Sequence, residues 1–447
     1  MVGLALSAVS LLVALRPARS AEAGRVRPRA LTVSAAHPVL SPNGDGVSET
    51  ARISVRVEIP ATLSVSIVDR ARRAVSRLAS SVPVRPGKFD FLWNGRVKGG
   101  GRPARDGAYA ALAHAEDATG RTLEAERVIV VDTRPPRVSW HGSPQRLSSG
   151  FLPLSLRVAD RSSRVRLRVS LFDQAGTRLT HLSPSPRSPG VVKLGWRPRP
   201  FGRALAPGAY RVEVAAGDDV GNERTSSRRA ILVDRPTPSR AVDRFSGAGR
   251  RVALTFDDCS WGSAWGSILR TLRAHATKGT FFCPGRQVLA NPPLARRTVW
   301  DGHSIGSHGW DHANFARLPY GSALARLISD REVWWRLARA SPTPFFRPPY
   351  GAFNRSVVAA AGRAGYATIV LWDVDPFDWR RPGVGVITSR VLRGARSGSV
   401  ILLHAAPQTA AALPAIIRGL RSRGLHPVTL AELARHGTPV PGRPRSS

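Results

Sequence analysis

The sequence predicts a multidomain protein: two all-β sandwiches followed by an α/β domain built on a parallel sheet. Its 447 residues are about three times the length of a typical single domain. Residues 31–234 contain an internal repeat with the size of a β-sandwich. From residue 250 onwards, short apolar runs alternate instead with helical stretches, which is typical of α/β folds.

Two copies of one pattern make up the N-terminal half of the chain. Gly-Ala-Tyr at 107–109 recurs at 208–210, 101 residues later, and Trp93 has its counterpart in Trp196. Apolar and polar residues alternate at 53–59, 63–67 and 165–171, as in strands with one buried face. This pattern predicts two immunoglobulin-like sandwiches, at 31–134 and 137–234.

Residues 41–46, Ser-Pro-Asn-Gly-Asp-Gly, resemble the opening motif of bacterial Ig-like domains of the flagellar-hook-capping type. The Trp-Asn-Gly and Asp-Gly-x-Tyr elements of the first copy fit that family too. The resemblance implies spacer or adhesive modules of secreted proteins. The side-chain oxygens of Asn43 and Asp45 indicate either a calcium site or a plain turn, and the second copy lacks the motif.

Three further segments lie outside these sandwiches. Residues 1–23 join an apolar run, too short to span a bilayer as a helix, to two small-x-small cleavage patterns. We expect a signal peptide or N-terminal anchor, and hence a secreted or cell-envelope protein; the alternative is a buried N-terminal strand or helix. Residues 235–249, rich in Pro, Ser, Arg and Gly, predict a linker, and 437–447 a flexible tail.

The charge balance restricts the partners. Lys and Arg number 67 against 30 Asp and Glu, a formal net charge of +37. Such a protein attracts polyanions, among them anionic cell-wall polymers. No recognised nucleic-acid-binding motif is present, so we expect no specific nucleic-acid partner. We expect membrane contact only if the N-terminal segment is retained. Two cysteines exclude a disulfide-dense scaffold and a Cys-only zinc module.

Residues 250–436 carry the α/β pattern. Apolar runs at 252–256, 279–282, 367–371 and 400–403 alternate with helical stretches such as 323–338 and 409–421. This predicts a parallel sheet, either covered on its faces or closed into a barrel. In such barrels the chemistry lies at the carboxyl ends of the strands.

Polar residues follow several of these runs. Asp257 and Asp258 end the first, either as an acidic turn or with one carboxylate on a metal and the other facing substrate. His308 and His312, at i and i+4, can bind one cation together. With a carboxylate they would form the open three-ligand site that is typical of catalytic zinc.

Three more segments complete the pattern. Phe-Arg-Pro-Pro-Tyr-Gly at 346–351 is a rigid loop, which would hold an arginine side chain and a backbone N–H at defined positions. Trp-Asp-Val-Asp-Pro-Phe-Asp-Trp at 372–379 follows another apolar run. His404 ends the last run, a position where a lone histidine is usually structural.

In this order the five segments resemble the polysaccharide deacetylase family with the NodB homology domain, carbohydrate esterase family 4. The resemblance implies a distorted (β/α)7 barrel that removes acetyl groups from sugar polymers. It assigns Asp257 as the general base and His404 as the general acid. Arg347 would orient the base, and Asp378 would support the network.

The resemblance also assigns the binding residues. The metal ligands would be Asp258, His308 and His312, holding a divalent ion, most often zinc, with cobalt or another ion as the alternative. Residues expected at the substrate are Pro349, Tyr350, whose backbone N–H would hold the oxyanion, and Trp379.

Cys259 stands where the family usually has glycine. If 255–256 align with 280–281 on neighbouring parallel strands, about 4.8 Å apart, Cys283 lies within disulfide reach of Cys259. We predict a Cys259–Cys283 disulfide in an exported protein; the alternatives are two free buried thiols or a cysteine that binds the metal.

The resemblance implies a metal-dependent deacetylase acting on an N-acetylglucosamine polymer, either peptidoglycan or a chitin-like glycan. The alternative is a non-catalytic envelope carbohydrate-binding or adhesion protein with a degenerate barrel. Degeneration normally removes a ligand, the base or the acid, and all of these are present here.

Overall fold

The computed structural model describes residues 30–97, 102–142, 145–183, 186–202 and 204–445. The predicted signal peptide or anchor, residues 1–23, lies outside the described residues. The chain forms two compact units, Met1–Thr133 and Arg134–Ser447. Within the described ranges, no helix is long and apolar enough to cross a membrane.

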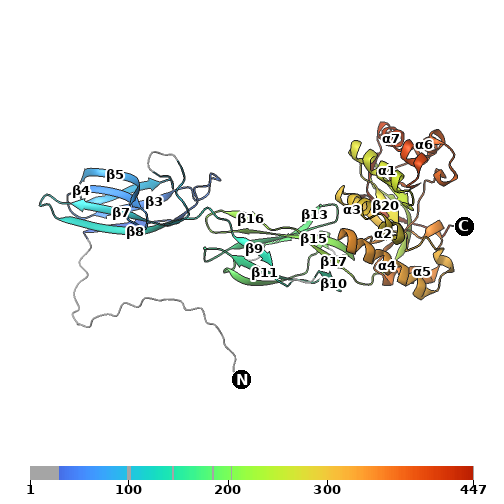
Figure 1. Cartoon of the computed structure of the whole chain (residues 1–447), viewed down its shortest axis with the longest axis horizontal. Helices are drawn as coiled ribbons and strands as arrows, with labels where there is room; N and C mark the ends of the chain where they lie inside the picture. The colour runs from blue at the N-terminus through green and yellow to red at the C-terminus, as the bar shows by residue number, and fades with distance from the viewer. Residues whose placement is uncertain (1–29, 98–101, 143–144, 184–185, 203, 446–447) are drawn as a thin grey trace, which may run out of the picture. The chain divides into compact units, whose positions relative to one another are not determined.

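Unit 1 is a two-layered β-sandwich (Figure 1). One sheet has the order β1-β3-β6 and the other β2-β8-β7-β4-β5. Their bounds are β1 (Leu31–Ala35), β2 (Val39–Leu40), β3 (Ala51–Val57), β4 (Ala61–Val68), β5 (Ala74–Val84), β6 (Gly87–Trp93), β7 (Gly107–Glu116) and β8 (Thr122–Val131). Alternate residues of β3 and β4 are buried in one shared core, so the period-two pattern identified these strands correctly.

In the loop before β3, side-chain oxygens accept hydrogen bonds from backbone N–H groups of the same loop. Asp45 Oδ1 accepts the Val47 N–H at 2.7 Å, and Asn43 Oδ1 accepts the Asp45 N–H at 3.0 Å. Neither residue belongs to a group of three close metal-binding side chains in the described part of the chain. These contacts are those of an Asx-type turn and favour the turn over the calcium site.

Unit 2 begins with the second copy of the sandwich. Its sheets have the orders β14-β11-β9 and β10-β17-β15-β12-β13, the same arrangement as in unit 1, with β16 beside β15. The bounds are β9 (Arg137–Trp140), β10 (Arg146–Leu147), β11 (Leu152–Ala159), β12 (Arg166–Phe172), β13 (Arg178–Leu182), β14 (Gly190–Trp196), β15 (Gly208–Gly217), β16 (Glu223–Thr225) and β17 (Arg229–Val233). The repeated tyrosine has one role in both copies: the Tyr109 hydroxyl donates to Arg105 O at 2.8 Å and the Tyr210 hydroxyl to Ala206 O at 2.9 Å.

A curled sheet of nine strands forms the α/β domain (Figure 1). Its order is β24-β19-β20-β21-β22-β23-β18-β26, with β25 beside β19, and every pairing except β18–β26 is parallel. Isolated bridges, Val374 to Ile401 and Arg244 to Ser399, link the two sides of the curl. The strands are β18 (Arg240–Ser246), β19 (Arg251–Asp257), β20 (Thr280–Cys283), β21 (Ser304–Ser307), β22 (Phe345–Phe346), β23 (Thr368–Val370), β24 (Val400–His404), β25 (His426–Val428) and β26 (Thr438–Pro441).

Eight α-helices accompany this sheet in the described ranges. They are α1 (Gly262–Ala274), α2 (Gly285–Ala290), α3 (Pro292–Trp300), α4 (Tyr320–Ala338), α5 (Arg355–Arg363), α6 (Val384–Gly394), α7 (Pro407–Ser422) and α8 (Leu430–His436). The largest core cluster joins apolar side chains of α1, α7, β19 and β24. The sheet is therefore covered by helices, as the alternation of runs predicted.

Two boundary predictions are wrong. The expected linker, 235–249, contains β18, and the expected flexible tail, 437–447, contains β26, which pairs with β18. Val242 and Phe245 of β18 are buried, but they stand as isolated apolar residues among polar ones. A single strand with so few apolar positions shows no period, so composition alone indicated a linker.

The second sandwich and the α/β domain share a buried polar interface. The Arg331 side chain of α4, only 6% exposed, donates to both carboxylate oxygens of Asp234 at 2.7 and 3.0 Å. Gln174 exchanges two hydrogen bonds of 2.8 Å with the backbone of Ser341. These contacts explain why the second sandwich belongs to the same compact unit as the α/β domain.

Candidate active site

The carboxyl ends of neighbouring strands bring the predicted site residues together. Asp257 ends β19 and lies opposite His404, which ends β24. On the other side of β19, Cys283 of β20 pairs with Ser307 of β21, directly before His308. Segments about 150 residues apart in the chain therefore meet at one edge of the sheet.

Asp258, His308 and His312 form a group whose ligand atoms all lie within 4.8 Å of one another. Asp258 Oδ1 is 3.4 Å from His308 Nε2 and 3.1 Å from His312 Nε2. His308 Nδ1 lies 2.7 Å from the carbonyl oxygen of Arg347. Because a carbonyl only accepts, Nδ1 carries a proton, and Nε2 is the ring nitrogen that faces the carboxylate. Nε2 and the carboxylate oxygen are the atoms that would ligate a cation placed between them.

The electrostatics of this group agree with that fit. Burial alone would raise the pKa of Asp258, but hydrogen bonds from His308 and His312 and the positive charges of His308 and His404 hold the pKa well below its usual range. Burial lowers the pKa of His312, and Asp258 more than reverses this, so that the pKa is raised. The carboxylate therefore attracts positive charge to this point, as a divalent cation requires.

Asp257 is held from behind by a buried arginine. Arg347 has a fully buried side chain, and its Nη1 donates to Asp257 Oδ1 at 2.6 Å and to Thr255 Oγ1 at 2.9 Å. Its other donors go to the carbonyl oxygens of Val370 and Leu371. The second carboxylate oxygen, Oδ2, lies 3.8 Å from His308 Nε2. Asp257 thus directs its second oxygen toward the metal-binding group while Arg347 holds the first.

His404 is held by a buried carboxylate, whereas Asp257 is held by a buried arginine. Asp378 Oδ1 lies 2.7 Å from His404 Nδ1, and Asp378 Oδ2 accepts from the His404 backbone N–H at 2.7 Å and from Thr409 Oγ1 at 2.6 Å. Burial lowers the pKa of His404, but the hydrogen bond and charge of Asp378 outweigh it and raise the pKa to about 9. The imidazole is therefore protonated at neutral pH, as a general acid must be.

A pocket of about 800 Å³ opens over these groups. Its lining residues are Asp257, Asp258, His308, His312, Pro348, Tyr350, Trp372, Asp373, Asp375, Phe377, Trp379, Arg380, Leu402, His404 and Arg445. Tyr350 and Trp379 are 53% and 52% exposed, so both predicted aromatic residues are available to a ligand.

The prediction for Pro349 is wrong. It was expected at the substrate, but its side chain is buried and Pro348 lines the pocket in its place. Both prolines are buried, and of the two only Pro348 borders the pocket, which sequence spacing does not reveal.

Other lining residues were not predicted. Trp372, Phe377 and Arg380 belong to the loop after β23, and the aromatic residues between its acidic ones were a usable signal. Arg445 comes from the segment expected to be a flexible tail, and nothing in the sequence marked it.

Several lining residues have strained backbones. Asp258, His312, Tyr350 and Phe377 have φ values of 70°, 60°, 63° and 57°, in the left-handed region that non-glycine residues rarely adopt. Such conformations cost on the order of 1–3 kcal/mol each and persist where surrounding contacts enforce them, often at functional sites. Their concentration around one pocket supports a functional site there.

The structure joins Cys259 and Cys283 by a disulfide, with the Cα atoms 5.2 Å apart. The strand register that suggested this bond is confirmed, since Thr255 pairs with Thr280 and Phe256 with Phe281. Cys259 directly follows Asp258, so the bond fixes the loop that carries this carboxylate to β20.

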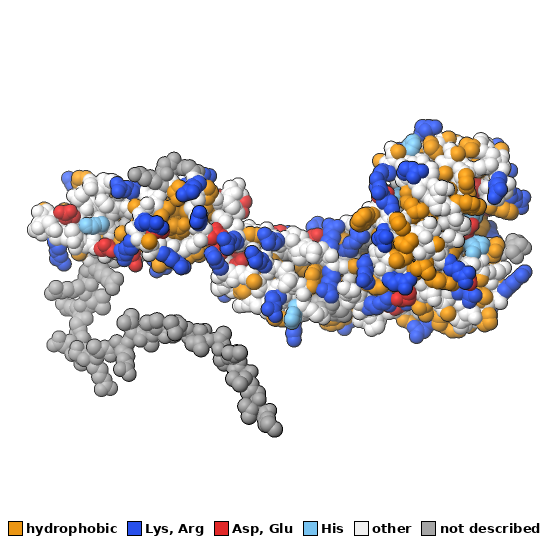
Figure 2. Space-filling view, in the orientation of Figure 1, with side chains coloured by type: hydrophobic (Ala, Val, Ile, Leu, Met, Phe, Trp, Pro, Cys, Tyr) orange, Lys and Arg blue, Asp and Glu red, His pale blue; other side chains and the backbone are white. Residues whose placement is uncertain are grey.

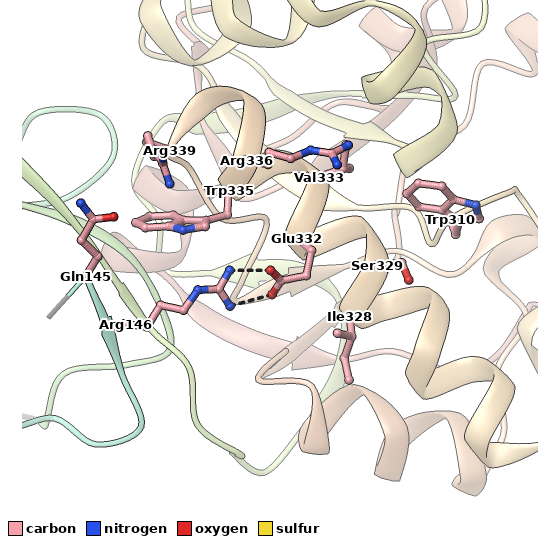
Figure 3. Close-up of a pocket in the computed structure, with 10 residues that line it drawn as sticks. All are labelled: Gln145, Arg146, Trp310, Ile328, Ser329, Glu332, Val333, Trp335, Arg336 and Arg339. Carbon is pink, nitrogen blue, oxygen red and sulfur yellow. Dashed lines mark hydrogen bonds and ion pairs between the residues drawn. The ribbon is translucent and has the colours of Figure 1, made fainter.

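A second cavity, of about 910 Å³, lies between β10 and α4 (Figure 3). Arg146 there forms a two-pronged contact with Glu332, with Nη1 and Oε1 2.9 Å apart, next to the Trp335 ring (Figure 3). None of the base, acid or metal-binding candidates lines this cavity. It therefore belongs to the contact between the second sandwich and the α/β domain rather than to the chemistry.

Comparison with known proteins places the α/β domain. A family model described as polysaccharide deacetylase matches residues 246–369. The peptidoglycan-N-acetylglucosamine deacetylase PgdA of Listeria monocytogenes is 36% identical over 185 residues, which cover 41% of this chain and 39% of the relative. The chain thus spans about two fifths of that relative's length.

Two shorter relatives are covered almost completely. A peptidoglycan-N-acetylglucosamine deacetylase of Bacillus cereus is 36% identical over 190 residues, covering 41% of this chain and 88% of the relative. A chitooligosaccharide deacetylase of a Bradyrhizobium strain is 34% identical over 197 residues, covering 40% and 89%. A solved structure of a peptidoglycan N-acetylglucosamine deacetylase matches with TM-score 0.42 and 31% identity, covering 45% of this chain and 95% of that chain. Through its C-terminal α/β domain, the chain belongs to the polysaccharide deacetylase family.

Proposed function

We propose that this protein hydrolyses the N-acetyl groups of an N-acetylglucosamine polymer, either peptidoglycan or a chitin-like glycan. One observation carries the proposal: Asp257 and His404 meet at the ends of neighbouring strands, beside a group of three metal-binding side chains. Relatives of the α/β domain are named as deacetylases of peptidoglycan and of chitooligosaccharides.

Asp258, His308 and His312 would hold a divalent cation, zinc first and cobalt as the alternative. Bound there, the cation would supply Lewis acidity toward the acetyl carbonyl and the attacking water. The chain's own residues would move the protons. Asp257 Oδ2 would take a proton from the water, while Arg347 holds this carboxylate in position.

The acid side completes the reaction. An amide nitrogen leaves only if it is protonated, and His404 carries the proton for it. As the C–N bond breaks, His404 would give this proton to the sugar amine, and acetate would be released. The backbone N–H of Tyr350 would donate to the oxyanion of the tetrahedral intermediate, and Trp379 would line the sugar site.

The test is acetate release from N-acetylated peptidoglycan and from chitooligosaccharides. Metal-free protein, zinc-restored protein and the Asp257→Asn variant are compared side by side. We expect release that requires zinc and disappears in the variant. Zinc binding without release from either polymer would contradict the proposed reaction and favour the degenerate binding module. No zinc binding at all would overturn the ligand assignment.

For the rest of the chain we propose an extracytoplasmic location and an envelope-retention role. The matching strand orders of the two sandwiches and their equivalent Tyr109 and Tyr210 hydrogen bonds support two Ig-like modules of one type. The net charge of +37, with many basic side chains on the face seen in Figure 2, favours anionic wall polymers. Deleting residues 31–133 leaves unit 2 intact and should weaken wall binding; undiminished binding would contradict the role.

A further inference from the structure

The C-terminal segment reaches the active-site pocket. β26 pairs with β18, the Gly442 N–H donates to Ala241 O at 3.1 Å, and the Arg445 N–H donates to Gly351 O at 3.1 Å. Gly351 belongs to the turn that presents Tyr350 to the pocket. The segment after β26 is therefore tied to the pocket wall by backbone hydrogen bonds.

The side chain of Arg445 is oriented by its surroundings. Its guanidinium lies over the Trp372 ring, 5.6 Å from the centroid, and Nη2 donates to Trp372 O at 2.5 Å. A Cβ atom on Gly351 would stand 2.7 Å from Arg445 Cγ, so the glycine makes room for this arginine. Guanidinium has five N–H donors, and Arg445 is exposed and lines the pocket, so donors remain for a ligand.

A second arginine of the pocket is held in the same way. The guanidinium of Arg380 lies 4.7 Å from the ring centroid of Trp379 and 5.3 Å from that of Phe377. Among the residues that the structure describes, no carboxylate comes within 4.0 Å of the guanidinium nitrogens of Arg380 or Arg445.

The acidic residues of the pocket are already engaged. Asp257 is paired with Arg347, and Asp258 belongs to the metal group. Asp373 accepts from the Val400 N–H and from Ser399 Oγ. Asp375 Oδ1 accepts the Phe377 N–H at 2.7 Å. The two arginines thus offer stacked cations to whatever enters the pocket.

We propose that Arg380 and Arg445 form an anion-recognising subsite, which makes the pocket selective for acetylated glycans that carry carboxylates. This inference rests on the proposed deacetylation and decides between its two polymers. The flat, forked guanidinium matches a carboxylate with two parallel hydrogen bonds, and stacking on an aromatic ring keeps it in place. Peptidoglycan carries carboxylates on its lactyl-peptide stems, whereas chitin-like glycans are neutral.

The experiment separates charge from shape. Acetate release is measured on soluble peptidoglycan glycopeptides and on the same glycopeptides with their carboxylates converted to amides. Variants are Arg445→Gln, Arg380→Gln and the control Arg443→Gln, an exposed arginine with no polar contact in the described part of the chain. For wild type we expect kcat/KM to be about tenfold or more higher on the charged glycopeptides.

Each of the two pocket variants should lower this charged-to-amidated ratio about tenfold, while Arg443→Gln keeps the wild-type ratio. A ratio that Arg445→Gln and Arg380→Gln leave unchanged would overturn the subsite. Should wild type release no acetate from any glycan, the proposed function fails instead. Calorimetric binding of the two glycopeptides to wild type and to Arg445→Gln then still decides the subsite.

Discussion

Two buried pairs, Asp257–Arg347 and His404–Asp378, lie on either side of the metal group. Each pair joins a carboxylate to a cation, but the member that faces the pocket differs. On one flank the carboxylate of Asp257 faces the pocket and the cation of Arg347 is buried behind it. On the other flank the imidazole of His404 faces the pocket and the carboxylate of Asp378 is buried behind it. The closest contacts are nearly equal, 2.6 Å and 2.7 Å.

The difference between the two pairs shows what each buried partner does. The buried Arg347 is a permanent cation, and its 2.6 Å contact orients the Asp257 carboxylate. A buried carboxylate keeps its imidazole partner as the cation, with a pKa raised to about 9 despite burial. In the proposed mechanism, each buried partner thereby supports one role: proton acceptor for Asp257 and proton donor for His404.

The largest expected effect separates these two roles. Asp257→Asn and His404→Gln should each lower kcat/KM on an N-acetyl substrate by about a thousandfold. With an aryl acetate, whose leaving group needs no proton, His404→Gln should recover most of its rate and Asp257→Asn should not. Acetate release on both substrates is the measurement. Equal recovery by both variants would contradict the assigned division of labour.

Stability should respond unequally to breaking the two pairs. Asp257→Asn leaves the Arg347 charge buried without its partner, which we expect to lower the free energy of unfolding by about 3 kcal/mol or more. Asp378→Asn leaves His404, which can lose its proton and become neutral, so a loss of about 1–2 kcal/mol is expected. Urea unfolding of the two variants tests this, and equal losses would refute the asymmetry.

The dependence of activity on pH should reflect the pKa of His404. Because Asp378 raises the pKa of His404 to about 9, the general acid is protonated below that pH, and activity should fall as the pH rises through it. In Asp378→Asn the pKa returns toward its usual value near 6.5, so the alkaline limb moves to lower pH and the rate at pH 8 drops about thirtyfold. Asp373→Asn, which lines the pocket without touching His404, is the control. An alkaline limb that stays in place would disprove the role of Asp378.

The smallest effects come from two buried threonines that support the hidden partners. Thr255 Oγ1 accepts from Arg347, and Thr409 Oγ1 donates to Asp378. Thr255→Val removes two hydrogen bonds, from Arg347 and to Ile401 O, and Thr409→Val removes one. Both variants keep the ion pairs, so we expect less than about a tenfold loss of kcat/KM. Neither should move the alkaline limb, since both His404 hydrogen bonds to Asp378 remain. A limb that moves with Thr409→Val would show that the hydroxyl, not the charge, controls His404.

Much of this site could be predicted from the sequence because its residues lie at the ends of apolar runs. Asp257 and His404 end apolar runs, and parallel strands bring their ends to one edge, so their meeting followed from the pattern. The register of 255–256 on 280–281 followed in the same way. Residues fixed by strand periodicity were predictable because the period is local.

The missed features depend on contacts between distant segments. Arg445 reaches the pocket only because β26 pairs with β18, and neither strand has enough apolar residues to be recognised. Pro348 rather than Pro349 borders the pocket, at a turn where Tyr350 is left-handed. The Arg331–Asp234 contact joins the second sandwich to the α/β domain through two surface-type residues. Such pairings leave no trace in composition or spacing.

The Cys259–Cys283 disulfide makes the loop that carries Asp258 sensitive to thiol reductants. It spans 24 positions, and closing a loop of that size stabilises the fold by about 3 kcal/mol in the chain-entropy description. Because Cys259 directly follows Asp258, a thiol reductant would release the very loop that presents this ligand. We expect dithiothreitol to weaken zinc binding, measured by competition with a chromogenic chelator, and the Cys259→Ala/Cys283→Ala variant to match the reduced protein. On the proposed ligand assignment, the state of this one bond would therefore affect metal affinity as well as the stability of the fold.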